Sequence, residues 1–197
     1  MIIKKAEFLR SIKTKDQHFN KVTPEIAFVG KSNAGKSSLI NYLTNNGKLA
    51  RVSKQPGKTR LINYFTINDS FYMVDLPGYG FAKRTKSEAE VWRRLTDGYF
   101  TKNPNIDSLK LVCQLVDSRT GPTADDLDML YYLRETGMPH LLVATKTDKL
   151  NATETGEFLA AVAGEALTKD LPLILYSAKT NRGRDELWRK IYETTGI

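Results

Sequence analysis

Cysteine and histidine are scarce in this chain of 197 residues, which contains one cysteine and two histidines. The single cysteine, Cys113, cannot form a disulfide within the chain, and no Cys/His cluster has the spacing of a zinc site. No apolar run approaches the roughly 20 residues of a membrane span, and charges recur throughout residues 1–16, so we expect no signal peptide. The composition therefore favours a reducing cytoplasm, and we expect Cys113, within the apolar run LVCQLV, to be a small buried core residue.

Acidic residues are outnumbered: 22 Asp and Glu residues stand against 30 Lys and Arg residues and give a formal net charge of +8. The segment 47–68 contains no acidic residue at all. Basic proteins favour polyanionic partners such as nucleic acids, although a solvated basic surface produces the same balance. With 41% hydrophobic and 26% charged residues, the chain has the composition of a globular protein, and its length suits one domain.

A polar loop bounded by glycines separates two apolar segments. The run EIAFVG (25–30) is rich in β-forming residues, and SSLINYLTNN (37–46) has apolar residues at helical spacing. Between them, Gly30, Gly35, Lys36 and Ser37 match G-x-x-x-x-G-K-[ST], a pattern that chance produces on the order of once per hundred such chains. Glycines let backbone amides wrap around phosphate oxygens, the lysine reaches the β- and γ-phosphates, and the serine hydroxyl ligates Mg²⁺. The stretch therefore predicts a strand, a phosphate-binding loop and a helix.

Two further motifs follow buried apolar runs. TKTD (145–148) follows HLLVA, and SAK (177–179) follows LPLILY. The Asp148 carboxylate can accept hydrogen bonds from N1–H and the exocyclic amine of guanine, which adenine does not offer in this arrangement. Lys146 can lay its stem along the base, and the backbone amides of SAK are placed to meet the guanine carbonyl. TKTD alone is more often a solvated turn, but both motifs downstream of a phosphate-binding loop indicate a guanine-nucleotide site.

Two loops offer groups for the metal ion and the γ-phosphate. DLPG (75–78) follows the apolar run FYMV, so Asp75 at the strand end is placed to hold Mg²⁺ through water, and the Gly78 amide is placed to meet the γ-phosphate. Thr59, in PGKTR (56–60), is placed to complete the Mg²⁺ shell when the γ-phosphate is present. We expect γ-phosphate contacts to order the segments 49–59 and 76–90, and loss of the γ-phosphate to release them.

In this order, GKSNAGKS, PGKT, DLPG, TKTD and SAK make the chain resemble a GTPase domain of the translation-factor class. More narrowly, SKQPGKTRLINYF (53–65), DLPGYGFA (75–82) and VDSRTGPTADD (116–126) resemble the EngB family of bacterial ribosome-biogenesis GTPases, also called YihA or YsxC. The resemblance covers nearly all of residues 22–195. It implies GTP or GDP as ligand, Mg²⁺ as cofactor, a cytoplasmic location, and a role in assembling the large ribosomal subunit.

The resemblance also implies which residues form the site. The nucleotide contacts it implies are Gly30, Lys31, Ser32, Asn33, Ala34, Gly35, Lys36, Ser37, Ser38, Pro56, Gly57, Lys58, Thr59, Asp75, Leu76, Pro77, Gly78, Thr145, Lys146, Thr147, Asp148, Tyr176, Ser177, Ala178 and Lys179. Catalytic roles fall on Lys36, Thr59, Gly78 and Asn33. Mg²⁺ is assigned to Ser37, Thr59 and Asp75.

The pattern of apolar runs predicts the fold. LINYFTI and FYMVDLP, separated by residues 68–70, indicate a hairpin, and strands and helices then alternate to the end of the chain. This order predicts a three-layer α/β P-loop GTPase domain over residues 22–197, with one antiparallel strand in a mostly parallel sheet and helices on both faces. Helices are expected at about 123–135, 153–169 and 184–194. Residues 1–21 are expected to form either an edge strand or a mobile arm.

Local roles are expected for several other residues. Asp117 and Arg119 are expected to pair with each other, and Pro122 to start the next helix with Thr123 or a neighbour as its cap. Trp92 and Trp188 fall within helical patterns and are expected to pack in the core or between helices.

Hydrolysis is expected to be slow. The residue after DLPG is Tyr79, where Ras-like GTPases have the glutamine that orients the attacking water. An aromatic side chain cannot do this, so we expect an intrinsic rate below about 10⁻² s⁻¹. For Asn33 the resemblance suggests a potassium ion beside the phosphates in place of an arginine finger. The alternative is that Asn33 only tolerates the tight loop geometry.

The expected partner is the large ribosomal subunit and its rRNA, because both nucleotide-sensitive loops are basic. Their basic residues are Lys48, Arg51, Lys54, Lys58 and Arg60 in the first loop region and Lys83, Arg84 and Lys86 in the second. Tyr79 and Phe81 are placed to stack on an exposed base or to pack on a protein. The alternatives are a solubilising loop surface and a signalling switch that binds a protein effector without RNA. We expect a monomer, with neither DNA nor a membrane as partner.

Overall fold

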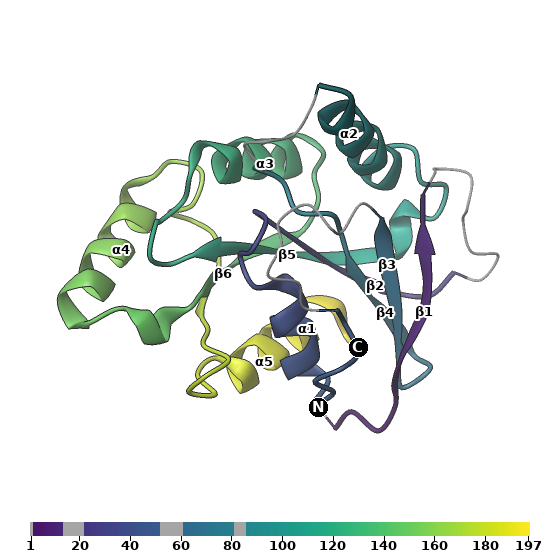
Figure 1. The fold of residues 1–197 in the computed structure, drawn as a ribbon, viewed down its shortest axis with the longest axis horizontal. Coiled ribbons are helices and arrows are strands. Elements are labelled where there is room, and N and C mark those ends of the chain that lie inside the picture. The colour runs from purple at the N-terminus through teal and green to yellow at the C-terminus, as the bar shows by residue number, and fades with distance from the viewer. Residues whose placement is uncertain (1, 14–21, 52–60, 81–85) are drawn as a thin grey trace.

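One twisted sheet lies at the centre of the molecule, in the strand order β1-β3-β4-β2-β5-β6-β7 (Figure 1). The structure is a computed structural model that describes residues 2–13, 22–51, 61–80 and 86–197. Within these residues the strands are β1 (Ala6–Ile12), β2 (Glu25–Gly30), β3 (Ile62–Ile67), β4 (Phe71–Asp75), β5 (Leu109–Asp117), β6 (His140–Thr145) and β7 (Leu173–Leu175).

A single strand, β3, runs against the others in the described part of the chain. It pairs antiparallel with both β1 and β4, whereas β2 pairs parallel with β4 and β5, and β5, β6 and β7 follow in parallel. Asn68 and Asp69 form the turn between β3 and β4 with positive φ angles of 49° and 53°, which asparagine and aspartate tolerate better than most residues. The predicted hairpin and the single reversed strand are thus confirmed.

Helices cover both faces of the sheet (Figure 1). They are α1 (Lys36–Leu43), α2 (Lys86–Phe100), α3 (Ala124–Glu135), α4 (Ala152–Gly164) and α5 (Arg184–Thr195), and the short 3₁₀ turns are Ile106–Ser108 and Thr147–Lys149. In β2, Ile26 and Phe28 pack in the core shared with α1 and α5, while Ala27 and Val29 pack in the core shared with α2 and α3. Successive side chains of a strand point to opposite faces, so a strand buried on both faces is apolar throughout. The three-layer prediction is confirmed.

Several expected helix ends need correction. The helix expected over 153–169 ends at Gly164, because Glu165 has an extended backbone and residues 165–171 form turns. Pro122 does not start α3. Instead Thr123 is the N-cap, and its side chain and that of Asp126 form a capping box.

The N-terminal segment, expected to be either an edge strand or a mobile arm, contains a strand: Ala6–Ile12 form the edge strand β1. Residues 14–21 lie outside the described part of the chain.

Other expectations about packing are confirmed. Cys113 is fully buried in β5, and Trp188 is buried against α1-side core residues. Trp92 packs beside the α2–α3 core, and its indole nitrogen donates to the Pro77 carbonyl oxygen at 2.8 Å. No helix among the described residues is long and apolar enough to cross a membrane.

Candidate nucleotide-binding site

The glycine-bounded loop connects the end of β2 to the start of α1. Gly35 has a φ of 101° and forms the N-cap of α1, a conformation that strains residues with a Cβ atom. A Cβ atom at Gly30 would lie 2.8 Å from the Leu115 carbonyl oxygen, so this glycine allows β2 and β5 to approach closely at the loop. The sequence therefore builds a tight turn that directs the N-terminus of α1 into the loop, as phosphate binding requires.

Lys36 lies inside the curve of this loop. Its side chain is buried, and its ammonium group donates to the Gly30 carbonyl oxygen at 3.4 Å. Gly78 closes the same space from the other side, because a Cβ atom there would lie 3.0 Å from the Ser32 backbone and 3.1 Å from the Lys36 Nζ atom. The structure thus brings together the two residues expected near the γ-phosphate, Lys36 and Gly78, although they are far apart in the sequence.

Ser37 and Asp75 form a pair of oxygen ligands beside Lys36. The Ser37 hydroxyl lies 3.5 Å from Asp75 Oδ2. Asp75 is 3% exposed, and its second carboxylate oxygen, Oδ1, is buried with no hydrogen-bond partner among the described residues. Burial raises the pKa of Asp75, while the nearby Lys36 ammonium and the Ser37 hydroxyl lower it. A buried carboxylate oxygen without a partner, next to a hydroxyl, fits a hard divalent cation such as Mg²⁺.

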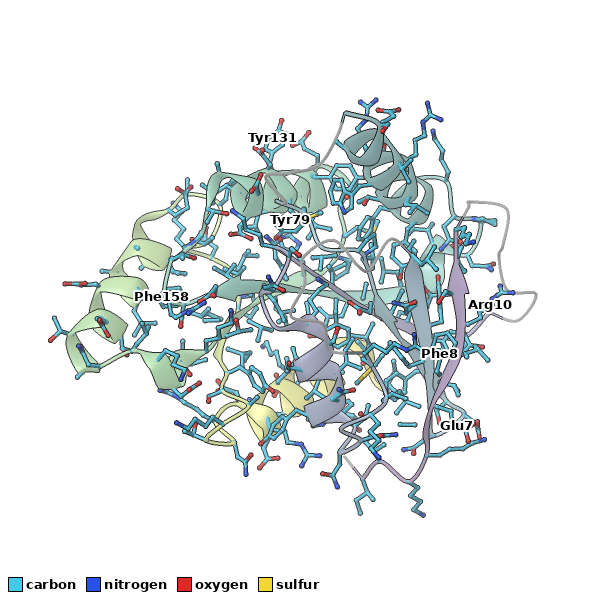
Figure 2. All side chains as sticks on the ribbon, viewed as in Figure 1. Glu7, Phe8, Arg10, Tyr79, Tyr131 and Phe158 are labelled. Atoms are coloured by element: carbon cyan, nitrogen blue, oxygen red, sulfur yellow. The ribbon has the colours of Figure 1, made fainter. Side chains whose placement is uncertain are left out.

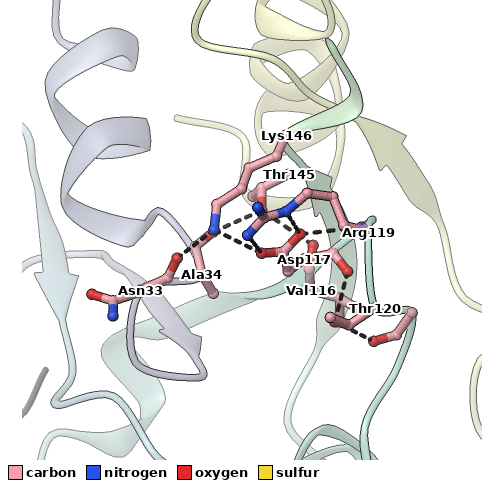
Figure 3. A network of polar contacts seen from close by, with 9 residues as sticks. Asn33, Ala34, Val116, Asp117, Arg119, Thr120, Thr145 and Lys146 are labelled. Atoms are coloured by element: carbon pink, nitrogen blue, oxygen red, sulfur yellow. Dashed lines mark hydrogen bonds and ion pairs between the residues drawn. The ribbon is translucent and has the colours of Figure 1, made fainter. Parts of the chain in front are cut away.

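The TKTD motif contacts the phosphate-binding loop directly. The Thr145 hydroxyl donates to the Ala34 carbonyl oxygen at 2.7 Å. Lys146 has a positive φ of 61°, and its ammonium group donates to the Asn33 carbonyl oxygen at 2.8 Å and to Asp117 Oδ2 at 2.7 Å. Figure 3 shows how Lys146 thereby joins the loop to the end of β5. These hydrogen bonds therefore hold the TKTD motif and the glycine-bounded loop in fixed relation.

Asp117 and Arg119 pair locally, as predicted. The Arg119 guanidinium donates to both Asp117 oxygens, at 3.0 and 2.7 Å. Partial burial would raise the pKa of the Asp117 carboxyl, but hydrogen bonds from Arg119 and Lys146 prevail and lower it to about 2. The carboxylate therefore stays ionised and accepts hydrogen bonds from both Arg119 and Lys146. The sequence analysis does not predict the contact with Lys146.

Asp148 lies beside the SAK motif. The Ser177 hydroxyl donates to Asp148 Oδ1 at 2.8 Å and accepts hydrogen bonds from the backbone amides of Lys179 and Thr180. The hydrogen bond from Ser177 lowers the pKa of Asp148, so the carboxylate is ionised and can accept two donors from one base edge. Thr147 donates to the Tyr176 carbonyl oxygen at 3.1 Å and ties the two motifs together.

Other predicted site residues lie outside the described part of the chain. Pro56, Gly57, Lys58 and Thr59 are among them, as are the basic residues Lys54, Arg60, Lys83 and Arg84. Their expected roles stay predictions. Lys48 and Arg51, which are described, are exposed at the start of the first basic loop.

The prediction that Tyr79 is available for stacking is wrong. Tyr79 is 5% exposed, and its hydroxyl donates to Asp126 Oδ1 at 2.8 Å and accepts from the Gln114 amide at 3.0 Å. Figure 2 shows Tyr79 next to α3. A polar glutamine in the apolar strand LVCQLVD was the available signal that a buried polar partner would be needed, but its identity depends on the tertiary fold. Phe81 lies outside the described residues.

The fold and the grouping of these motifs define a P-loop GTPase domain. A family model described as "50S ribosome-binding GTPase" matches residues 25–146. The chain is 43% identical over 190 residues to the probable GTP-binding protein EngB of Geobacillus kaustophilus, and the match covers 95% of each protein. It is 46% identical over 188 residues to the probable GTP-binding protein EngB of Clostridium beijerinckii, and that match covers 95% of this chain and 93% of the relative. It therefore belongs to the EngB family of GTP-binding proteins and is a GTPase, as the sequence analysis predicted.

Solved structures agree with this assignment. The crystal structure of a probable GTP-binding protein engB is 28% identical, with a TM-score of 0.65 over 87% of this chain and 98% of that one. Era, crystallised with MgGDPNP and nucleotides 1506–1542 of 16S ribosomal RNA, is 20% identical with a TM-score of 0.67, over 89% of this chain and 57% of that one. At that identity, the likeness to Era shows a shared fold.

Proposed function

We propose that this GTPase is a nucleotide-dependent switch with slow intrinsic hydrolysis that acts as a monomer in the cytoplasm during assembly of the large ribosomal subunit. One observation carries the nucleotide part of the proposal. The loop after β2, Asp75 at the end of β4, TKTD at the end of β6 and SAK after β7 all lie at the carboxyl edge of the parallel strands. Open α/β sheets bind ligands at this edge.

In this proposal each group of residues meets one part of GTP. Residues Gly30–Ser38 surround the phosphates with backbone amides, and Lys36 supplies a positive charge to the β- and γ-phosphates. Asp148 accepts from the guanine edge, with Lys146 along the base, while the residues Tyr176–Lys179 close the base site from the other side. Leu76, Pro77 and the Gly78 amide face the γ-phosphate, together with the segment Pro56–Thr59.

Mg²⁺ would be held by Ser37 and by Asp75, the latter through water, with Thr59 joining when the γ-phosphate is present. Bound there, the ion would offset the negative charge of the phosphates. The residues of the chain then have a positioning role. The Lys36 ammonium partly offsets the rise in the Asp75 pKa that burial causes, and Ser37 holds its hydroxyl toward the same carboxylate.

Slow hydrolysis follows from the direction of Tyr79. Its hydroxyl is bonded to Asp126, so the residue after DLPG presents no group that orients a water molecule at the γ-phosphate. Asn33 is a candidate to support hydrolysis with a potassium ion. Its φ of 67° also suits a tight loop, so both interpretations of Asn33 stay open.

The ribosomal part of the proposal is supported by two facts. The matching family model is described as ribosome-binding, and the chain has a net charge of +8 with basic residues in both nucleotide-sensitive loops. Backbone phosphates of RNA bind such residues, with release of counterions. Loss of the γ-phosphate would release these loops and with them the rRNA-facing surface.

The second basic loop gives a direct test. Lys83, Arg84 and Lys86 are replaced together by alanine, and binding to purified large subunits is measured in a salt series with a non-hydrolysable GTP analogue. We expect weaker binding and a salt slope smaller by about one unit per lost phosphate contact, with GDP affinity unchanged. The matched control replaces Lys102, Lys110 and Lys169, exposed residues toward the opposite edge of the sheet, and should bind like the wild type. Equal binding by both triple variants would refute the rRNA-facing surface.

A further inference from the structure

Tyr79 joins four parts of the site that are separate in sequence. Its backbone pairs with the phosphate-binding loop: the Ser32 amide donates to the Tyr79 carbonyl oxygen at 2.9 Å, and the Tyr79 amide donates to the Gly30 carbonyl oxygen at 3.4 Å. Its side chain points the other way and bonds to Asp126 of α3 and Gln114 of β5. The residue before it is Gly78, which closes the space around Lys36.

The Tyr79 side chain is held by several buried contacts. Asp126 accepts from Tyr79 with one oxygen, and with the other it accepts from the backbone amide and hydroxyl of Thr123, at 2.9 and 2.7 Å. Gln114 donates both to the Tyr79 hydroxyl and, at 2.7 Å, to the Asp126 carbonyl oxygen. The Tyr79 ring also packs edge-on against Trp92, with 6.1 Å between ring centroids. Gln114 Oε1 is buried without a hydrogen-bond partner among the described residues, but the hydrogen bonds that join Tyr79, Asp126, Gln114 and Thr123 restrict the positions of these side chains.

A second contact between the loop and α3 lies beside the first. Lys31 forms an ion pair with Asp125 at 3.1 Å. Gly80 passes between them with a φ of 67°, and a Cβ atom there would lie 2.6 Å from both Asp125 Oδ2 and the Lys31 side chain. The N-terminus of α3 therefore contacts both the Tyr79 side chain and the backbone that follows it at Gly80.

We propose that Tyr79 is a positioning residue that uses its buried hydrogen bond to Asp126 of α3 to hold Gly78 against Ser32 and Lys36, and thereby gives the site its affinity for the γ-phosphate. This inference rests on the proposed function, which places the Gly78 amide at the γ-phosphate. GDP does not depend on Gly78 in that arrangement, because residues 33–38 and the TKTD and SAK motifs hold the diphosphate and the base. The Tyr79 side chain therefore discriminates between the triphosphate and the diphosphate without touching either.

The test compares Tyr79→Phe with Tyr132→Phe. Tyr132 offers a matched control, because its hydroxyl also donates to an aspartate, Asp97, at 3.2 Å. This hydrogen bond joins α3 to α2 and does not involve the phosphate-binding loop. Dissociation constants for GDP and for a non-hydrolysable GTP analogue are measured with Mg²⁺ for wild type and both variants, alongside their melting temperatures. For Tyr79→Phe we expect about tenfold weaker binding of the analogue and GDP binding within about twofold of wild type, since a buried acceptor is left unpaired. Tyr132→Phe should change neither constant.

The other outcomes are equally informative. If Tyr79→Phe leaves both constants unchanged, or weakens both by the same factor, Tyr79 has only a structural role and the inference is wrong. If the wild type binds neither nucleotide, the site assignment itself fails, and the inference fails with it for a separate reason. Should Tyr79→Phe not fold, Gln114→Met removes the donor to the Tyr79 hydroxyl and should also weaken the analogue selectively. An unchanged ratio in that variant would overturn the inference.

Discussion

Lys146 and Asp117 form an ion pair with 2.7 Å between Nζ and Oδ2, and the same ammonium group donates to the Asn33 carbonyl oxygen (Figure 3). Lys146 of the TKTD motif is thus held by the end of β5 and in turn contacts the glycine-bounded loop after β2. Arg119 holds Asp117 from the other side, so residues of the chain itself form this arrangement.

Replacing Asp117 should therefore weaken binding of both nucleotides. In Asp117→Asn the charge that orients Lys146 is lost, and we expect about three- to tenfold weaker binding of GDP and of a GTP analogue alike, with no change in their ratio. The size follows from one charge-assisted hydrogen bond in a partly exposed setting. Fluorescent nucleotide titration measures it. Asp69→Asn, which removes an exposed ion pair with Lys5 at the hairpin, is the control and should bind normally.

Asp148 should determine the preference for guanine. Asp148→Asn replaces one acceptor oxygen by a donor that faces another donor on guanine, so GDP affinity should fall by about 100-fold or more. Competition between GDP and ADP measures the preference, which should largely disappear in the variant. Asp170→Asn, at an exposed turn before β7, is the control and should keep the wild-type preference for GDP over ADP. A variant at Asp148 that still excludes ADP would contradict the assignment.

Potassium should accelerate hydrolysis if Asn33 helps to hold it. Single-turnover GTP hydrolysis is measured in K⁺ and in Na⁺ at equal ionic strength, for wild type and Asn33→Ala. We expect faster hydrolysis in K⁺ for the wild type and equal rates in both salts for the variant. Equal rates for the wild type would leave Asn33 with its conformational role alone. In either salt, a wild-type rate above about 10⁻² s⁻¹ would contradict the expectation of slow intrinsic turnover.

Stability should fall as pH rises from about 4.5 to about 7, because of Glu25. Its carboxylate is buried and accepts from the Tyr99 hydroxyl at 2.8 Å. Burial raises its pKa from 4.5 to about 7, while hydrogen bonds from Tyr99 and Tyr64 partly oppose this. In this pH interval the folded protein holds a proton that the unfolded chain has released, so rising pH favours unfolding.

The effect can reach about 3 kcal/mol, since each pKa unit corresponds to about 1.4 kcal/mol. Glu25→Gln keeps an acceptor for Tyr99 but cannot ionise, so it should remove this part of the pH dependence and stabilise the protein at pH 8. Urea unfolding at pH 5 and pH 8 measures both effects. Glu7→Gln, an exposed carboxylate of β1, should leave the profile unchanged. A Glu25 variant with the wild-type profile would show that other groups cause the dependence.

The sequence predicts those features of the fold and the site that depend on residues close together in the chain. The loop from Gly30 to Ser37, the hairpin at Asn68–Asp69 and the Asp117–Arg119 pair are all encoded within short stretches, where glycine, turn residues and opposite charges act locally. Alternating apolar runs likewise predicted the order of strands and helices.

Long-range partners were not accessible in the same way. Tyr79 bonds to a residue 47 positions away, and Lys146 to one 29 positions away, so neither contact leaves a local pattern. The basic residues near Tyr79 in the sequence predict an exposed ring, whereas packing in the α2–α3 core and a hydrogen bond from Gln114 determine its position. The composition of residues 165–169 likewise predicts that α4 continues, whereas Glu165 is extended and the helix ends at Gly164.

The central claim is a nucleotide-dependent switch that binds the large ribosomal subunit. Co-sedimentation of the wild-type protein with isolated large and small subunits, in GDP and in a non-hydrolysable GTP analogue across a salt series, tests it most directly. The account predicts binding to the large subunit with the analogue, loss of that binding in GDP, and a steep decrease with salt. Absence of binding in both nucleotide states at low salt would contradict it and would favour a protein effector instead.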